Sequence, residues 1–435
     1  MTYLSPLWGG LCLTLAAVGA RAAEPLRAGA ARVSITPEVK AHPIPLGGYG
    51  AREGKPATGV HDPVYARALV LTQGPRKIAL VSTDLCFIPA GVKEAVLKQV
   101  GPETGLDANT LLLAATHCHS APEAMALNPR NVFSNPRVGI FDPWLFEFTV
   151  ERIAQAVRQA QARLRPARVG VAAERVPGLN RNRRGDETVD EEMTVLKVVE
   201  DSGRPQALAV FFTAHVTIFG PEMMEVSGGW AGVLERTLEE RLGGEAVVLF
   251  FNGAEGDQTT AGAEGANAFE RVEHYGRRVA AHALRLAEQA KPLPEVTLRS
   301  LSADLPLPER RASPFFAQIA GREYGVPEEQ LEALLHQLFP STAALMAMQV
   351  GDLVLLAVPG EPIAQIGLAL KAHARRAGAK QVAIVGLAND YIGYILTPEE
   401  YREGGYEATV SFYGDQLGPT LRAGMERLVE NLLAP

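Results

Sequence analysis

Short apolar runs that end in polar residues constrain the fold of this chain more than any other feature. Each run is rich in Val, Leu, Ile, Phe and Ala, and polar side chains follow it within a few positions. Uninterrupted apolar runs of this length predict strands buried on both faces, which are typical of mostly parallel sheets. The runs cover residues 77–82, 110–115, 207–212, 246–251, 353–358 and 382–386.

Helical patterns lie between many of these runs. Their apolar residues recur three and four positions apart, as on one face of a helix. The patterns cover 143–164, 267–290, 328–338 and 362–375. The alternation predicts an α/β fold, with a mostly parallel sheet flanked by helices and a ligand site at the carboxyl ends of the strands. No repeat or linker divides residues 23–435, so we expect a single large domain, in which the long aperiodic segments 122–142 and 306–327 can wall a pocket.

The first 22 residues have the pattern of a signal peptide. Residues 7–20 carry no charge, and Ala20 and Ala22 place small side chains before a cut after Ala22. An uncleaved anchor is the alternative, although the stretch is short for a bilayer. We therefore expect an exported protein, periplasmic or secreted, with no transmembrane span in the mature chain.

The bulk composition narrows the choice of partner. A formal net charge of -7 gives no reason to expect nucleic acid as a partner. A lipid substrate stays possible, because local concave surface rather than net charge holds an apolar ligand. Cleavage would leave Cys86 and Cys118, which we expect to be buried free thiols rather than a disulfide.

Four residues after the apolar runs have side chains suited to metal chemistry. His117 and His119 stand two apart, so that both imidazoles lie on one face of an extended chain. His215 and Glu361 follow two other runs. Each alone is equally well explained as a structural residue. Taken together, His117, His215 and Glu361 form the three-ligand N/O set of a catalytic zinc, which lowers the pKa of its water to about 7 and polarises a carbonyl.

Several motifs, in order, resemble the neutral/alkaline non-lysosomal ceramidase family. They extend from about residue 33 to 412. The motifs are GVHDPVYARA at 59–68, THCHS at 116–120, NRNRR at 180–184, NGxxGD at 252–257, PGEP at 359–362, NDYxGY at 389–394, EEY at 399–401 and GYEA at 405–408.

The resemblance implies an α/β zinc hydrolase and assigns roles to particular residues. The implied zinc ligands are His117, His215, Glu361 and Tyr394. The residues implied to act on the substrate are His119, Arg183, Tyr406 and Thr259. Tyr406 and Arg183 would donate hydrogen bonds to the oxyanion of a tetrahedral intermediate, and His119 would pass a proton to the departing amine. Asn252 and Asp257 could orient the zinc ligands from behind.

The chain departs from the family pattern at two places that contact substrate. After Ser120 it continues with Ala121, Pro122 and Glu123, whereas members of the family often have a glycine-rich Gly-Pro-Gly-Gly turn there. Thr259 replaces a serine that is tied to activity in the family, and a β-branched side chain is stiffer. The exact substrate is therefore less constrained than the hydrolytic chemistry.

We expect a zinc-dependent amidohydrolase that cleaves the N-acyl amide of ceramide or a related N-acyl lipid with a metal-bound water. A zinc-dependent esterase or small-amide hydrolase on the same fold is the alternative. A non-catalytic binding protein is a third possibility. Four other histidines fall in helical patterns and should be surface or packing residues, namely His274, His282, His336 and His373.

Overall fold

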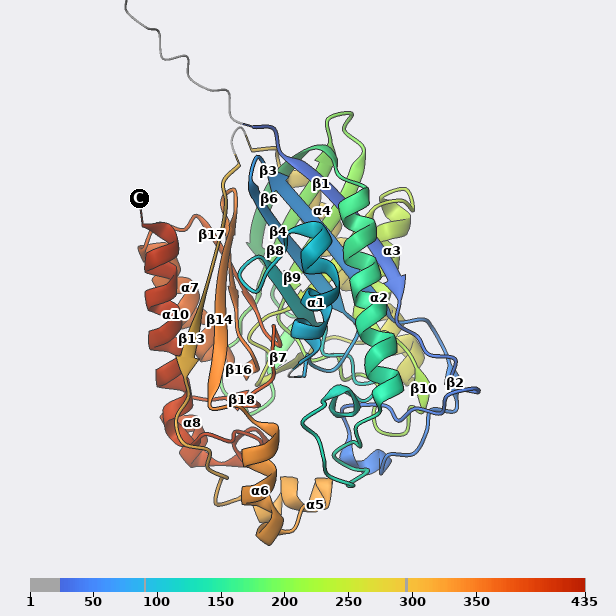
Figure 1. The fold of residues 1–435 in the computed structure, drawn as a ribbon, viewed down its shortest axis with the longest axis vertical. Helices are drawn as coiled ribbons and strands as arrows, with labels where there is room; N and C mark the ends of the chain where they lie inside the picture. The colour runs from blue at the N-terminus through green and yellow to red at the C-terminus, as the bar shows by residue number, and fades with distance from the viewer. Residues whose placement is uncertain (1–23, 90, 294–295, 435) are drawn as a thin grey trace, which may run out of the picture.

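The computed structural model describes residues 24–89, 91–293 and 296–434. The predicted signal peptide, residues 1–22, lies outside this part of the chain. Two β-sheets pack face to face, and helices cover the outer face of each, so that the molecule has four layers (Figure 1). This is an α/β domain, as the sequence predicts.

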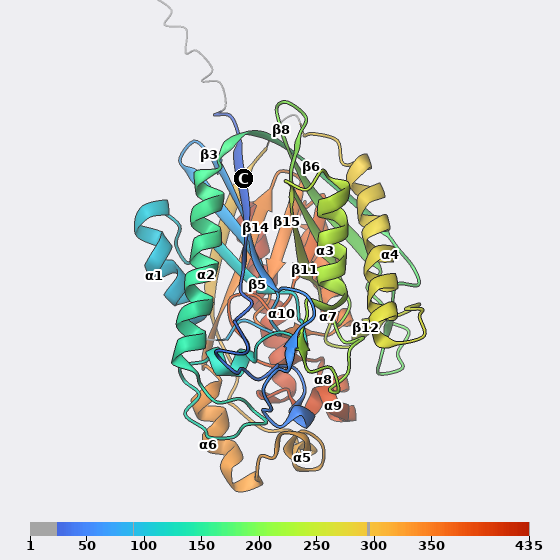
Figure 2. The ribbon, with the colours of Figure 1, turned by 90° about the vertical axis from the view of Figure 1, so that its right-hand side faces the viewer.

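The larger sheet has eight strands in the order β11-β9-β8-β6-β1-β3-β4-β5. Its strands are β1 (Arg27–Ser34), β3 (Tyr65–Gln73), β4 (Arg76–Thr83), β5 (Leu111–Ala115), β6 (Arg165–Arg175), β8 (Glu192–Glu200), β9 (Pro205–Phe212) and β11 (Val247–Asn252). Its outer face carries α1 (Val92–Thr104), α2 (Pro143–Ala162), α3 (Gly229–Arg241) and α4 (Ala268–Gln289), which stand side by side in Figure 2.

The smaller sheet has four strands in the order β13-β14-β15-β17. They are β13 (Leu298–Pro306), β14 (Thr342–Val350), β15 (Leu353–Ala357) and β17 (Gln381–Val385). Helices α7 (Ala364–Arg376) and α10 (Leu417–Leu433) cover its outer face. Short paired strands join the loops at the lower end in Figure 1, namely β2 (Gly59–Val60) with β10 (Glu225–Val226), β7 (Asn180–Asn182) with β12 (Gln258–Thr260), and β16 (Glu361–Pro362) with β18 (Tyr394–Ile395).

The prediction of a mostly parallel sheet is wrong. In the larger sheet only the β11–β9 and β4–β5 pairs are parallel, and the other neighbours are antiparallel. The apolar runs have a different cause. Leu69 points into the core between the two sheets, whereas Val70 packs beneath the helices. Both faces of each strand are buried because the second sheet takes the place of a second helical layer.

The individual elements that the sequence predicts are confirmed within a residue or two at most ends. All six apolar runs form strands, and the four helical patterns correspond to α2, α4, α7 and α6 (Glu328–Leu338). Helix α6 and the short α5 (Ala320–Tyr324) project beyond the lower ends of the sheets (Figures 1 and 2). Helices α8 (Pro398–Glu403) and α9 (Gly405–Thr409) lie in the loops that lead to α10.

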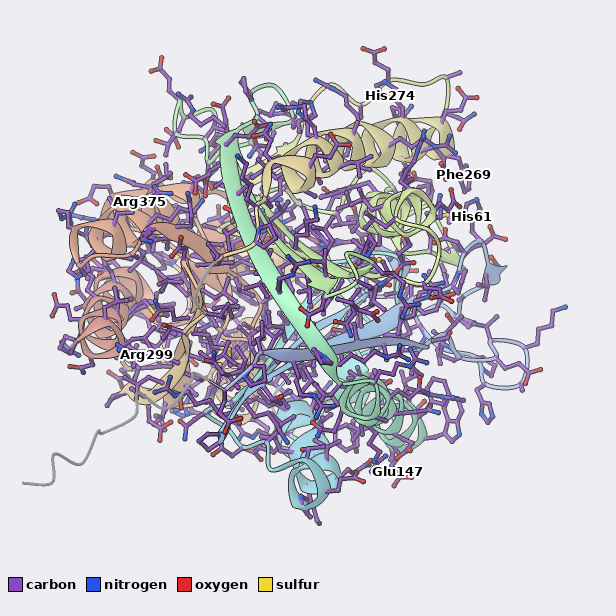
Figure 3. All side chains as sticks on the ribbon, turned by 90° about the horizontal axis from the view of Figure 1, so that it is seen from above. His61, Glu147, Phe269, His274, Arg299 and Arg375 are labelled. Carbon is purple, nitrogen blue, oxygen red and sulfur yellow. The ribbon has the colours of Figure 1, made fainter. Side chains whose placement is uncertain are left out.

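The sequence also predicts the state of two cysteines and the location of the histidines in helical patterns. Cys86 and Cys118 are buried free thiols, as predicted. Viewed along the sheets, His61 and His274 lie at the periphery, on the side that carries Phe269 (Figure 3). Within the described residues, no helix combines the length and apolar character needed to cross a membrane.

Candidate metal centre

Two histidines reach the centre from neighbouring loops at the lower end of the larger sheet. His117 lies two residues after β5, and His215 lies three residues after β9. An isolated parallel bridge between Cys118 and Val216 aligns the two loops. His117 has a left-handed backbone, with φ of 71°, which is uncommon outside glycine and turns the chain sharply at this point.

The other two predicted ligands are brought together by one short ladder. Glu361 on β16 pairs directly with Tyr394 on β18 in parallel register. The Pro359–Gly360 turn precedes Glu361, and Gly360 has no room for a side chain because a β-carbon there would lie 2.5 Å from the carbonyl oxygen of Gly393. The close backbone contact therefore fixes where the carboxylate and the phenol stand.

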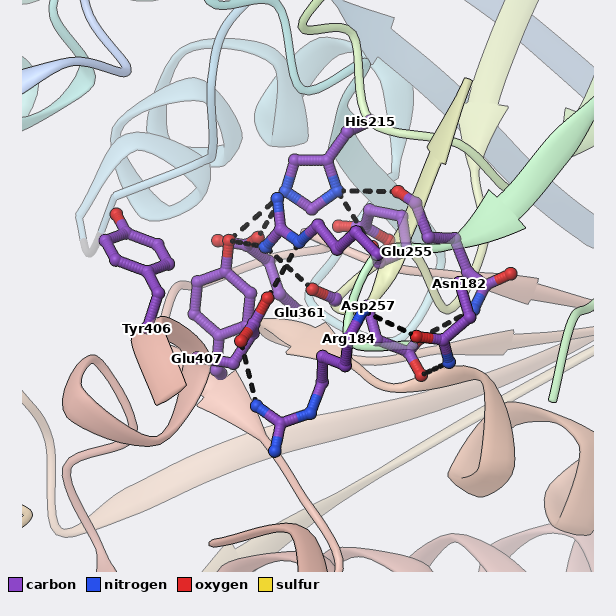
Figure 4. A network of polar contacts seen from close by, with 12 residues as sticks. Asn182, Arg184, His215, Glu255, Asp257, Glu361, Tyr406 and Glu407 are labelled. Atoms are coloured by element: carbon purple, nitrogen blue, oxygen red, sulfur yellow. Dashed lines mark hydrogen bonds and ion pairs between the residues drawn. The ribbon is translucent and has the colours of Figure 1, made fainter. Parts of the chain in front are cut away.

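The side chains of these four residues converge on a buried point. The Nε2 atoms of His117 and His215 each lie 3.3 Å from Glu361 Oε2. The Tyr394 hydroxyl lies 3.2 Å from His215 Nε2. One ligand atom from each of His117, His215 and Glu361 falls within 4.8 Å of the others. Figure 4 shows His215 and Glu361 facing each other across this point.

These residues fit a zinc ion. Glu361 Oε2 is buried and makes no hydrogen bond within the described chain, although two imidazole nitrogens face it. A buried carboxylate oxygen without a donor is costly, and a cation at this point would satisfy it. Two imidazoles and one carboxylate, with a position left for water, make up a common catalytic zinc set.

The charge states suit metal binding as well. Burial, with the nearby Arg183 and His117, lowers the pKa of His215 to about 3, so this imidazole is neutral and can offer a lone pair. Burial alone would raise the pKa of Glu361, but His117 and His215 hold it well below its usual range. The carboxylate is therefore ionised, as a ligand must be.

Hydrogen bonds behind the ligands fix their orientation. The Nδ1 atom of His117 lies 2.8 Å from the Cys86 carbonyl oxygen, and Nδ1 of His215 lies 2.8 Å from that of Glu255. Because a carbonyl can only accept, both Nδ1 atoms carry the proton and both Nε2 atoms face the centre. The Tyr391 hydroxyl donates to Glu361 Oε1 at 2.8 Å, which leaves Oε2 directed at the histidines.

Arg183 and Glu407 form the polar wall beside Tyr394. The guanidinium of Arg183 donates to the Tyr394 hydroxyl at 3.0 Å and to the Gly256 carbonyl at 2.9 Å, while its Nε pairs with Glu407 at 2.8 Å. The same carboxylate of Glu407 binds Arg184 from the other side (Figure 4). Arg183 therefore contacts the predicted ligand Tyr394. It is not among the residues that line the cavity described next.

A cavity of about 140 Å³ leads away from the centre. At its polar end stand His117, His119, Glu361, Tyr394 and Tyr406. The rest of its lining is mostly apolar and includes residues of α6 and of the two long segments 122–142 and 306–327, which the sequence predicts as possible pocket walls. The apolar lining includes Met125, Val138, Phe316, Val326, Leu334, Leu338, Phe339, Val410 and Phe412.

His119 and Tyr406 both face this cavity. His119 Nε2 lies 3.2 Å from His117 Nε2, and its buried Nδ1 has no hydrogen-bond partner among the described residues. Burial and the neighbouring His117 and His215 hold the pKa of His119 well below its usual range. The Tyr406 hydroxyl lies 2.9 Å from that of Tyr324, so one of the two donates to the other.

Three residues predicted to act at the site are not among those that line the cavity. Thr259 lies on β12 opposite Arg181 and is not among the residues that line the cavity. Asn252 binds backbone on both histidine loops, since its side-chain nitrogen donates to the carbonyls of Thr116 and Ala214. Asp257 accepts from the Ala364 backbone at the start of α7. Among the described residues, neither Asn252 nor Asp257 forms a hydrogen bond with the side chain of a predicted ligand.

Two further residues shape the centre without having been singled out from the sequence. Tyr391 stands in the NDYxGY motif, but nothing in the motif distinguishes it from Tyr394 as the partner of Glu361. Arg52 is buried, and its Nη1 donates to the carbonyls of Gly47 and His119 at 2.6 Å each. No spacing connects Arg52 to His119, 67 residues away, so only the fold reveals the contact.

Comparisons with known proteins identify the family of this chain. The family described as "Neutral/alkaline non-lysosomal ceramidase, N-terminal" matches residues 27–272 and 332–422. The neutral ceramidase of Pseudomonas aeruginosa is 27% identical over 486 aligned residues, which cover 93% of this chain and 72% of that protein. The neutral ceramidase of Mycobacterium tuberculosis is 24% identical, with coverage of 84% and 71%.

Solved structures share the fold. The crystal structure of the Pseudomonas aeruginosa neutral ceramidase superposes with a TM-score of 0.81 at 24% identity, covering 94% of this chain and 75% of that one. A structure titled "Ceramidase complexed with C2" gives 0.77 at 23% identity, with the same coverage. The family match covers most of the chain and includes every residue of the candidate centre. The chain therefore belongs to the neutral/alkaline non-lysosomal ceramidase family of amide hydrolases.

Proposed function

We propose that this protein is a zinc-dependent amidohydrolase that cleaves the N-acyl amide of ceramide or a related N-acyl lipid into a fatty acid and an amine. The observation that carries the proposal is the buried set of His117, His215 and Glu361, with Tyr394, at the polar end of an apolar cavity. A lipid amide has the same division into a polar reacting group and apolar chains.

Zinc held by these residues would polarise the amide carbonyl and lower the pKa of water. The chain's own residues then bind and orient the substrate. The apolar lining of the cavity, which includes Met125 and Phe412, would hold a hydrocarbon chain. Burial of apolar surface contributes about 25 cal/mol of binding free energy per Å² removed from water. That contact directs the amide toward the histidines and Glu361.

Two residues are placed to stabilise charge and move protons. Tyr406 faces the cavity and can turn its hydroxyl from Tyr324 toward the oxygen of a tetrahedral intermediate. His119 faces the same space with a neutral imidazole, so it can take up a proton and deliver it to the departing amine. Arg183 supports the site through the Tyr394 hydroxyl, and its direct contact with substrate remains a prediction.

We also propose that residues 1–22 are a signal peptide that directs export of the protein. Their uncharged stretch, followed by Ala20 and Ala22, supports cleavage and export to the periplasm or the medium. N-terminal sequencing of the protein recovered from outside the cytoplasm would test this, with Ala23 expected as the first residue.

The function itself is tested by metal analysis and turnover on the same preparation. We expect about one zinc per chain and hydrolysis of an N-acyl-sphingosine that a chelator abolishes and added zinc restores. Matched N-acyl and O-acyl compounds separate an amidase from an esterase, because only a preference for the N-acyl compound supports the proposal. His117→Ala should abolish turnover, whereas a binding protein has no turnover to lose.

A further inference from the structure

Glu123 places a carboxyl group on the wall of the cavity near its polar end. Residues 121–123 run alongside residues 45–47, because Gly47 N donates to the Ala121 carbonyl at 2.9 Å and Glu123 N to that of Pro45 at 3.0 Å. Gly139 packs against the methylene stem of Glu123. The backbone around this carboxyl is therefore well defined.

Only one oxygen of this carboxyl has a structural task. Oε1 accepts a hydrogen bond from Met125 N at 2.9 Å and caps the short helical turn Ala124–Leu127. Oε2 makes no hydrogen bond to another described residue. A β-carbon placed on Gly47 would lie 3.5 Å from Oε2, so the free oxygen lies against the bare backbone there.

Two arginines near Glu123, Arg52 and Arg137, form their hydrogen bonds with other groups. The Arg52 guanidinium donates to five backbone carbonyls, those of Gly47, His119, Gly220, Pro221 and Met223. Arg137, which also lines the cavity, pairs with Glu53 and donates to the Glu323 carbonyl. Neither guanidinium forms a hydrogen bond or ion pair with Glu123.

A carboxyl in these surroundings lacks a partner. Much of the surrounding cavity is apolar, and burial raises the pKa of Glu123 to about 7. When a ligand displaces water from the cavity, a carboxyl oxygen that loses its water costs free energy unless the ligand supplies a hydrogen bond. A ligand that brings a donor to Oε2 would recover that cost, and a wholly apolar ligand would not.

The position of Oε2 relates it to the reacting end of the cavity. The His119 imidazole lies against Gly48, where a β-carbon would fall 2.3 Å from Nδ1, and Oε2 lies against the adjacent Gly47. Neighbouring Cα atoms are 3.8 Å apart. The carboxyl and the imidazole thus lie against adjacent residues of the chain, and Glu123 and His119 both line the cavity.

We propose that Glu123 is a specificity-determining residue, which selects substrates that carry a hydroxyl or ammonium donor close to the amide that is cleaved. This inference rests on the proposed N-acyl amide hydrolysis.

The test compares matched substrates in matched variants. An N-acyl amino alcohol, an N-acyl alkylamine of equal length and an N-acyl diamine with a free ammonium group are each assayed with the wild type, Glu123→Gln and Glu123→Leu. Gln keeps the acceptor for Met125 N and the side-chain volume, so this variant remains informative if the Leu variant folds poorly. Glu151→Gln, on an exposed part of α2, is the control.

We expect the wild type to prefer a donor-bearing compound over the plain alkylamide by roughly ten- to a hundredfold in kcat/KM. Glu123→Leu should reduce that preference to about onefold, through loss on the donor-bearing compound rather than gain on the other. A hydroxyl-selective site keeps part of its preference in Glu123→Gln, because the amide oxygen still accepts. An ammonium-selective site loses all of it with the charge.

A second readout separates this inference from the proposed function. Dissociation constants of the three compounds are measured with metal-free protein, where no turnover occurs. A donor preference in binding that Glu123→Leu removes supports the role of Glu123 even if no compound is hydrolysed. Equal binding and turnover of all compounds by the wild type, or a preference unchanged in Glu123→Leu, would overturn it even if hydrolysis is fast.

Discussion

The Tyr391 hydroxyl donates a hydrogen bond to Glu361 Oε1 at 2.8 Å, so that one oxygen of the carboxylate is held by the protein and the other faces the histidines. The Tyr391 ring is itself fixed by stacking on Phe87, with centroids 4.0 Å apart. We predict that Tyr391→Phe weakens zinc affinity by roughly ten- to a hundredfold, because groups that orient a ligand carry such effects. Competition with a chromogenic chelator measures this.

Tyr413→Phe is the matched control for that experiment. It removes a hydroxyl that donates to the Pro340 carbonyl at 2.7 Å, away from the four predicted ligands. Zinc affinity should stay unchanged in Tyr413→Phe. If both variants bind zinc as the wild type does, Tyr391 does not orient Glu361.

Loss of a ligand should remove the metal altogether. His215→Ala deletes one imidazole of the predicted set. It leaves His117, Glu361 and the phenol of Tyr394, so that only two ligands of the common imidazole and carboxylate set remain. We expect zinc per chain to fall from about one to near zero, as measured by elemental analysis. His373→Ala, on α7 where the imidazole lies near Glu426 and Glu430, should keep its zinc. Full zinc occupancy in His215→Ala would place the metal elsewhere.

Gly48 leaves room for the His119 imidazole because it has no side chain. Its φ is 93°, and a β-carbon there would lie 2.3 Å from His119 Nδ1. Gly48→Ala should lower kcat by tenfold or more, because even small misplacement of a catalytic group is costly. Gly203→Ala is the control, since Gly203 has a similar φ of 86° and a β-carbon there meets nothing within 4 Å. Both variants should lose about 1 kcal/mol or more of unfolding free energy, but only Gly48→Ala should lose activity.

A buried ionic cluster under α3 gives the protein a pH-dependent stability. Arg67 Nη1 lies 2.8 Å from both Asp84 Oδ2 and Glu235 Oε2, so two carboxyls share one guanidinium. Burial raises the pKa of Glu235 well above its usual range; Arg67 opposes this shift, whereas the charge of Asp84 adds to it. Because this folded-state pKa is raised, the stability that Glu235 contributes is fully present below its unfolded pKa of about 4.3 and is lost as pH rises through the folded value.

We therefore predict that Glu235→Gln makes the unfolding free energy less dependent on pH above about 4.3. The amide oxygen can still accept from Phe250 N, so the hydrogen bond between α3 and the edge strand β11 is retained. Urea unfolding at several pH values measures the slope, and Glu240→Gln, exposed on the same helix, should leave it unchanged. An identical slope in wild type and Glu235→Gln would show that Glu235 is ionised throughout.

The sequence predicts the candidate ligands more completely than the sheet that carries them. His117 and His215 could be found because each follows an uninterrupted apolar run, and such runs are strands wherever they are buried on both faces. Burial on both faces has two causes, however, and only the fold distinguishes a second helical layer from a second sheet. That ambiguity produced the wrong expectation of a mostly parallel arrangement.

Contacts between distant loops are the part that local patterns do not contain. Arg52 reaches the His119 carbonyl, and Tyr391 rather than a neighbouring tyrosine reaches Glu361, because of how the loops cross. Thr259 shows how a motif position can differ from its place in the fold. It pairs with Arg181 in the short β12–β7 ladder and is not among the residues that line the cavity, so its role in the reaction stays a prediction.

The four predicted ligands come from both sheets of the sandwich. His117 and His215 follow strands of the larger sheet, whereas Glu361 and Tyr394 belong to the loops of the smaller one. A bound ion would therefore add a cross-link between two layers that also meet through apolar side chains and through ion pairs such as that of Lys371 with Asp190. Cys86 and Cys118 form no disulfide, so the metal would supply the kind of covalent-like tie that exported proteins commonly obtain from oxidised cysteines. The melting temperatures of the metal-free and zinc-bound forms would then measure how much this cross-link between the two sheets stabilises the fold.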